Sequence, residues 1–176
     1  VALRNAFVSV IPITIAGSLA VLIKSFILLA KTQLGWSNFA TIIKPLGDIS
    51  YIVWRGSFSL FALFLVVALG YQLAKTYEAN RLAGAIIALA SFMMSVANFA
   101  QIKLHGSNVT IRQAFDISQF STTGIFTAIL FGSGGFAVYL ICYKARIMIH
   151  LNTNMPHAEQ VAFDSLLPGI ISLFCI

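Results

Sequence analysis

Long runs without a charged side chain organise this sequence. Four runs hold 19 to 27 uncharged residues each, and a fifth run reaches the last residue. A helix needs about 20 apolar residues to cross a hydrocarbon core roughly 30 Å thick. We therefore predict four complete membrane spans and the start of a fifth. They cover approximately 5–23 (or 5–30), 56–74, 82–102, 122–143 and 163–176.

The type of secondary structure follows from how the apolar residues are arranged. Strands of a membrane barrel alternate apolar and polar positions over about ten residues. The stretch 60–67 is instead apolar at every position, which is typical of a helix surrounded by lipid. We therefore predict an all-α fold, a polytopic transmembrane helix bundle.

The end of the first span and the segment after it are ambiguous. Pro12 lies inside the span, and Lys24 interrupts an apolar stretch that continues to Ala30. Either the helix ends near residue 23, or Lys24 extends toward a headgroup from a longer, tilted helix. The moderately apolar segment 32–51, with Trp36 inside it, predicts an interfacial segment rather than another crossing.

Composition supports a membrane protein and excludes several other classes. Hydrophobic residues make up 59% of the chain and charged residues only 9%. A soluble domain carries about a quarter charged residues, so soluble enzymes and disordered regulators are excluded. The 11 Lys and Arg residues are scattered, which argues against a nucleic-acid partner. If successive spans alternate in direction, five of these basic residues lie on one side of the membrane and six on the other. The positive-inside rule therefore does not orient the chain.

Candidate catalytic and metal-binding residues form no set with the required spacing. The three histidines lack a second ligand three or four residues away, and Cys142 and Cys175 fit buried free thiols. All five carboxylates lie outside the predicted spans or at their ends. We therefore predict no catalytic, cofactor-binding or metal-binding residue, and no carboxylate for ion coupling.

Small residues recur at a spacing of four and predict close helix contacts. Such ridges let two helix backbones approach closely in lipid. They belong either to packing within the chain or to the interface of a homodimer. The candidates for a dimer interface are Gly84, Ala88, Gly124, Ala128 and Gly132.

On residues alone, the chain is a fragment of a polytopic membrane protein and most resembles part of a transporter. Both ends look cut, because the chain starts without Met and stops inside an apolar run. One alternative is half of an ion-coupled secondary transporter, in which Lys24 is the only ionisable residue within a span. Another is a small membrane assembly or immunity protein, for which a complete chain of this length would suffice.

Four segments, in order, resemble the membrane subunit (enzyme IIC) of the bacterial phosphoenolpyruvate sugar phosphotransferase system, in its lactose/cellobiose/chitobiose branch. The first, 2–23, starts with Arg-Asn and has a mid-helix Pro and a Gly-Ser pair, and the second, 56–75, ends in Gly-Tyr-x-Leu-Ala-Lys. In the third, 77–92, a small-residue-rich helix follows a short loop. In the fourth, 123–169, a Met-Pro turn precedes Ser-Leu-Leu-Pro-Gly. His157-Ala158 departs from the Pro-Pro or Pro-Ala frequent after that Met-Pro, and the segment 103–119 matches little.

The resemblance implies a permease of about ten spans in the bacterial inner membrane, of which this chain would be the N-terminal half. Such a subunit carries a β-linked disaccharide such as cellobiose, chitobiose or lactose, and a IIB partner phosphorylates it. The chain itself would be a non-enzymatic scaffold that supplies dimer contacts. The resemblance also implies that Arg4, the loop 75–81 and the segment 144–164 face the cytoplasm. Sugar contacts are expected in the missing C-terminal half, so the substrate-binding residues of this chain are unknown.

Overall fold

The computed structural model describes residues 1–33, 37–96, 99–104, 107–112, 117–145 and 157–175. Six α-helices, one two-stranded β-hairpin and two 3-10 turns follow each other along the described chain. In order, they are α1 (Ala2–Gln33), α2 (Ser37–Ser57), α3 (Phe61–Thr76), α4 (Arg81–Ser95), β1 (Phe99–Leu104), β2 (Ser107–Arg112), η1 (Ile117–Phe120), η2 (Thr122–Gly124), α5 (Ile125–Lys144) and α6 (His157–Phe174).

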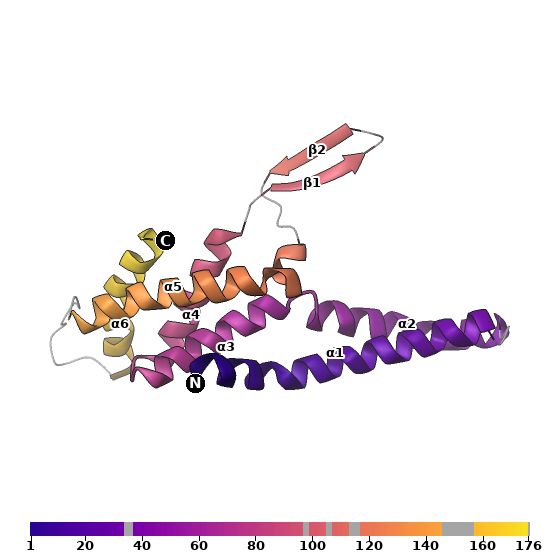
Figure 1. The fold of residues 1–176 in the computed structure, drawn as a ribbon, viewed down its shortest axis with the longest axis horizontal. Coiled ribbons are helices and arrows are strands. Elements are labelled where there is room, and N and C mark those ends of the chain that lie inside the picture. The colour runs from indigo at the N-terminus through magenta and orange to yellow at the C-terminus, as the bar shows by residue number, and fades with distance from the viewer. Residues whose placement is uncertain (34–36, 97–98, 105–106, 113–116, 146–156, 176) are drawn as a thin grey trace.

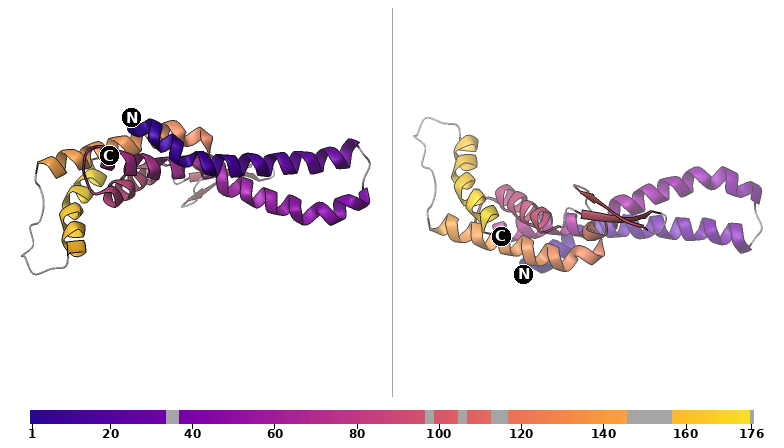
Figure 2. Two further views of the ribbon diagram at one scale, coloured as in Figure 1. Left: turned by 90° about the horizontal axis from the view of Figure 1, so that it is seen from below. Right: turned by 90° about the horizontal axis from the view of Figure 1, so that it is seen from above.

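The helices form a bundle from which two hairpins project (Figure 1). The bundle contains α3, α4, α5, α6 and the first part of α1, which packs against α3. The rest of α1 continues beyond the bundle with α2 beside it, and both further views show this helical hairpin as an arm (Figure 2). The β-hairpin leaves the bundle between α4 and η1.

The predicted helical membrane fold is confirmed. Of the described helices, those over Ala2–Leu29 and Thr122–Lys144 are long and apolar enough to cross a membrane. Pro45–Ser57 and Phe61–Thr76 together make a third candidate, bent by 42° at the break between them. In the first of these, Lys24 does not end the helix, which continues to Gln33.

Two predicted boundaries need correction. The run 82–102 is not one helix, because α4 ends at Ser95 and the chain is a strand from Phe99. Val96 takes an extended conformation, with φ −75° and ψ 127°, which ends the helix. From Ser37 the segment predicted as interfacial is helical, as α2, which packs along α1, and its place at the membrane interface stays a prediction. The last helix begins at His157 rather than near 163.

Close packing of α3 between α4 and α5 forms the centre of the bundle. A four-residue turn joins α3 to α4, and the side chain of Asn80 caps α4 by accepting from the N–H of Leu82 at 3.1 Å. Ala62, Val66, Ala88 and Ala128 are completely buried where the three helices meet. Since these side chains are small, the helix backbones lie close to one another, as in membrane bundles.

Serine hydroxyl groups in the described apolar helices bond mainly within their own helix, whereas the buried hydroxyl of Tyr139 in α5 has no hydrogen-bond partner among the described residues. Lipid offers no hydrogen-bond partner, so a polar side chain in a span needs a protein partner. Ser91 Oγ, fully buried, donates to the carbonyl oxygen of Ile87 at 2.8 Å. One buried exception joins two helices, because Ser172 Oγ on α6 donates to the carbonyl oxygen of Gly135 on α5 at 2.6 Å. Like Ser91, five other residues donate to the carbonyl oxygen four positions earlier in the same helix: Ser9, Ser50, Ser57, Thr76 and Ser133.

The contact between α3 and α4 predicts that Gly70 admits no larger residue. A Cβ at Gly70 would lie 2.6 Å from the carbonyl oxygen of Gly84 and 2.7 Å from Cβ of Ala88. Gly70→Ala should therefore cost about 1–3 kcal/mol of stability, because backbone atoms must move. The measurement is thermal unfolding of the full-length protein in detergent.

The control for this change is Gly134→Ala in α5, where a Cβ would meet nothing within 4 Å. That change should leave stability equal or higher, because Ala is favoured over Gly inside a helix by about 0.5–1 kcal/mol. Equal unfolding temperatures for Gly70→Ala and the unmodified protein would contradict the close approach of α3 and α4.

Candidate functional site

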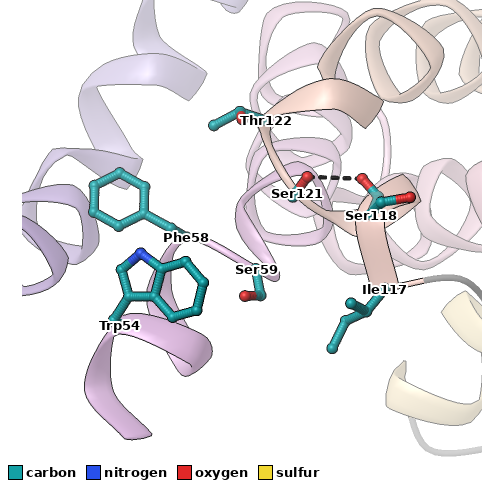
Figure 3. A pocket seen from close by; sticks show the side chains of 7 residues that line it. All are labelled: Trp54, Phe58, Ser59, Ile117, Ser118, Ser121 and Thr122. Carbon is teal, nitrogen blue, oxygen red and sulfur yellow. Dashed lines mark hydrogen bonds between the residues drawn. The ribbon is translucent and has the colours of Figure 1, made fainter. Parts of the chain in front are cut away.

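A pocket of about 430 Å³ lies where the end of α2 meets η1 and η2 (Figure 3). Its residues come from two parts of the chain, one at the α2–α3 break and the other in the two 3-10 turns. They are Trp54, Phe58, Ser59, Ile117, Ser118, Ser121 and Thr122.

The bend between α2 and α3 positions the aromatic side of this pocket. Phe58 N–H donates to the carbonyl oxygen of Trp54 at 2.9 Å, and the chain then turns into α3. Phe58 also packs on α1, because a Cβ at Gly17 would lie 2.7 Å from its ring. The two aromatic side chains are therefore held by the meeting of three helices.

The opposite side of the pocket is tied to the bundle core. Phe120 of η1 is buried and makes an edge-to-face contact with Phe92 of α4, with ring centroids 6.0 Å apart. Ser121 Oγ donates to the carbonyl oxygen of Ser118 at 2.7 Å, which closes the turn (Figure 3). The position of η1 thus depends on the core contact of Phe120.

The described lining residues offer hydroxyl groups and two aromatic rings, and none of them is charged. Hydroxyls both donate and accept hydrogen bonds, and aromatic rings contact apolar surfaces. Such a pocket suits an uncharged amphipathic ligand, and it has no acid, base or nucleophile pair for chemistry. No signal in the sequence predicted it, because residues about sixty positions apart meet there only after folding.

A second hollow, of about 310 Å³, lies between α1 and α2 and also has Trp54 in its lining. It is lined by Val21, Lys24, Ser25, Leu28 and Trp54. The ammonium nitrogen of Lys24 lies 5.7 Å from the ring centroid of Tyr51 and 6.0 Å from that of Trp54. Unlike the first pocket, this one contains a positive charge.

The five small residues predicted as dimer contacts lie inside the chain's own bundle, which corrects that prediction. Gly84 faces Ala74 and Phe136, and Gly132 faces Val66. Ala88 and Ala128 are completely buried, and Gly124 is buried against Gln119. A residue buried within one chain offers no surface to a second copy, so the intramolecular alternative describes all five.

The other singled-out residues come to lie far from these pockets or outside the described residues. Cys142 is a buried free thiol in α5, whereas Cys175 is free but exposed after α6. His157 begins α6, and His105 and His150 lie outside the described residues. In the described part of the chain, His, Cys, Asp and Glu form no group of three that could hold a metal ion.

Two EIIC components from other bacteria match this chain along almost its whole length. The cellobiose-specific EIIC component of Lactococcus lactis is 26% identical over 100% of this chain and 44% of the relative. The oligo-beta-mannoside-specific EIIC component of Bacillus subtilis is 23% identical over 97% of this chain and 37% of the relative. The chain therefore spans less than half the length of these relatives.

A solved structure shares the fold. The crystal structure of ChbC, the IIC component from the N,N'-diacetylchitobiose-specific phosphotransferase system, matches with a TM-score of 0.82 and 18% sequence identity. The match covers 99% of this chain and 40% of that chain.

The family assignment rests on a match along nearly every residue. The sequence model described as "Phosphotransferase system, EIIC" matches residues 4–176. EIIC components are integral proteins of the bacterial inner membrane, which agrees with the apolar helices α1 and α5. The chain therefore belongs to the EIIC family of the phosphotransferase system.

Proposed function

We propose that this chain is the N-terminal half of a permease subunit that carries a β-linked disaccharide across the bacterial inner membrane. The observation that carries the proposal is the family match over residues 4–176. Relatives named for cellobiose and oligo-beta-mannosides support the class of sugar. In this proposal a IIB partner phosphorylates the sugar at the cytoplasmic face, and the chain is a transport component rather than an enzyme.

The arrangement of charges supports coupling to phosphorylation rather than to an ion gradient. An ion-coupled transporter places an ionisable group inside a span, because burying a charge is costly unless it works. Of the two described helices that could each cross a membrane alone, α5 carries its one charged residue, Lys144, at its end, and the crossing part of α1 carries the bases Arg4 and Lys24 but no carboxylate. Phosphorylation of the sugar on arrival would itself make uptake downhill, so no intramembrane acid is required.

The orientation proposed for the chain has its basic ends on one side. The N-terminal part of α1 meets the C-terminal part of α3, where Gln72 Nε2 donates to Ser9 Oγ at 3.4 Å. Lys144 at the end of α5 lies over the ring of Tyr77 in the α3–α4 turn, 5.6 Å from its centroid. Arg4, this turn and Lys144 therefore lie at one end of the bundle (Figure 1), which we propose faces the cytoplasm.

The experiment that tests this function measures sugar uptake by membrane vesicles containing the full-length protein. We expect uptake of radiolabelled cellobiose only when phosphoenolpyruvate and the soluble phosphotransferase components are inside the vesicles. The product inside should be the sugar phosphate, because transport and phosphorylation occur together. Uptake of free sugar driven by a proton gradient alone would overturn the proposal and favour an ion-coupled transporter.

The uncharged pocket between α2 and the 3-10 turns provides a second test, because we propose that the transported sugar binds in the other half. Ser59→Ala and Thr122→Val remove two hydroxyls of its lining with little change in shape. We expect the KM of uptake to stay unchanged. A hydrogen bond to the sugar is worth about 1 kcal/mol, so a rise of about fivefold in either variant would place the sugar in this pocket.

We propose further that the full subunit is a homodimer and that the outward side of α1 makes the contact. Ile11, Ile15 and Leu19 are four residues apart and so lie on one side of the helix. They are 46%, 54% and 55% exposed, which leaves this side available to a second copy. Close packing between spans needs such a continuous apolar surface.

Cysteine crosslinking in native membranes tests the dimer. In a background without other cysteines, Ile15→Cys should form a crosslinked dimer, because the two copies of α1 lie together. The matched control is Leu130→Cys, which is 63% exposed but belongs to a different helix, α5. Equal crosslinking at the two positions would indicate random collisions and contradict an interface at α1.

A further inference from the structure

We propose that the hollow between α1 and α2 around Lys24 binds an anionic phospholipid. The phosphate would contact Lys24, and one acyl chain would lie along the adjoining side of α1. The inference is independent of the proposed sugar and of the IIB partner. It rests on the depth of Lys24, the rings beside it, its charge and the shape of the surface.

The length of α1 places Lys24 at the surface of a membrane. Between Arg4 and Lys31 it is the one charged residue in this helix. It lies 20 residues after Arg4, and a helix rises about 1.5 Å per residue, so the two charges are about 30 Å apart along the axis. That distance equals the thickness of the hydrocarbon core. With Arg4 at one interface, Lys24 therefore reaches the headgroups of the other.

The aromatic residues beside Lys24 independently indicate the same depth. Tyr51 and Trp54 lie one turn apart on α2, with ring centroids 6.0 Å from each other. Tyr and Trp are enriched at the membrane–water interface, because each has an apolar ring and one polar atom. Both rings are partly exposed, 47% for Tyr51 and 38% for Trp54. A cation, two rings and one interface thus coincide at the α1–α2 contact.

The charge of Lys24 is held in place but not neutralised. Its ammonium nitrogen lies within 6.0 Å of both ring centroids, a distance at which cation–π attraction orients the side chain. Within the described residues its partners are these two rings, and no carboxylate is among them. The site therefore retains a positive charge, which a phosphate group complements through a charge-assisted hydrogen bond.

The surface around Lys24 has the two-part shape of a phospholipid. The hollow of about 310 Å³ includes Lys24, Ser25 and Trp54, whose polar atoms can donate to phosphate oxygens. A second groove, of about 150 Å³, adjoins it and is lined by Leu22, Ser25, Phe26 and Leu29. Ser25 lines both, so the polar hollow continues into an apolar one. Phe26 and Leu29 are 70% and 54% exposed, which leaves the apolar groove open to an acyl chain.

An anionic headgroup fits this site better than a zwitterionic one. A zwitterionic headgroup brings its own cation beside the phosphate, and that cation would compete with Lys24 and be repelled by it. Phosphatidylglycerol carries a phosphate with no such cation and adds hydroxyl groups for hydrogen bonds. The proposal therefore commits to an anionic phospholipid, with phosphatidylglycerol as the probe.

Native mass spectrometry of the full-length protein, stripped of lipid in a mild detergent, tests the proposal. The protein is titrated with phosphatidylglycerol, with phosphatidylcholine of the same acyl chains, and with glycerol phosphate. We expect a bound phosphatidylglycerol at concentrations where phosphatidylcholine and glycerol phosphate do not bind. Lys24→Gln should weaken that binding roughly tenfold or more, because a charge-assisted hydrogen bond is lost.

Two further variants separate this site from diffuse attraction. Lys24→Arg keeps the charge and the cation–π contact, so it should restore binding and show that the variant fold is sound. The matched control is Lys144→Gln, which removes another lysine that lies over an aromatic ring, 5.6 Å from Tyr77. We expect this control to bind phosphatidylglycerol as the unmodified protein does.

Several results would overturn the proposal. Equal losses in Lys24→Gln and Lys144→Gln would indicate attraction by total charge rather than by a site. Equal binding of the two phospholipids would remove the role of headgroup charge, and tight binding of glycerol phosphate would indicate a site for soluble anions. Absence of any bound phosphatidylglycerol at saturation would mean that protein, either the remaining part of the subunit or a second copy, covers the hollow.

Discussion

The bundle depends on the close approach of α3 to α4 at Gly70 and Gly84. The carbonyl oxygen of Gly84 lies where a side chain at position 70 would begin. In lipid the hydrophobic effect does not drive helices together, so association depends on backbone proximity and dispersion contacts. Once these two helices are in contact, their joint surface receives α5, where Gly132 faces Val66. The other elements are arranged around this three-helix centre.

Contacts with this three-helix centre place other elements at the two ends of the bundle. The α3–α4 turn and the end of α5 meet at one end, with Lys144 over Tyr77. At the other end, Phe120 packs on Phe92 of α4 and so places the turns that form the uncharged pocket. The core contacts therefore position both the basic end of the bundle and the surfaces that could receive a ligand.

The helical arm extends the chain beyond the bundle, and its chemistry differs from that of the core. α1 is longer than the hydrocarbon core is thick, so it must tilt or extend beyond the core. Trp54 lines both the pocket at the 3-10 turns and the hollow around Lys24. One aromatic side chain thus belongs to two surfaces, one of which carries a positive charge.

The sequence alone predicted the membrane class and the helical fold, and it left the helix boundaries less certain. Charge-free runs report which segments avoid water, but a run such as 82–102 does not report where a helix changes to a strand. The runs therefore indicated α1 and α5 well and missed the end of α4. The small-residue ridges correctly indicated close helix contacts without saying which helix was the partner.

What only the tertiary structure decided is which residues meet. Spacing placed Gly84, Ala88 and Ala128 on helix faces, but burial showed that the partners of those faces belong to the same chain. Lys24 was visible as a charge in an apolar run, whereas Tyr51 and Trp54 come beside it only because α2 folds back along α1. The physical reason is that hydropathy is a local property of a segment, whereas a pocket or an interface requires residues distant in sequence to approach each other. The sequence determined whether each segment favours lipid or water, and the packing of the helices determined which residues contact one another.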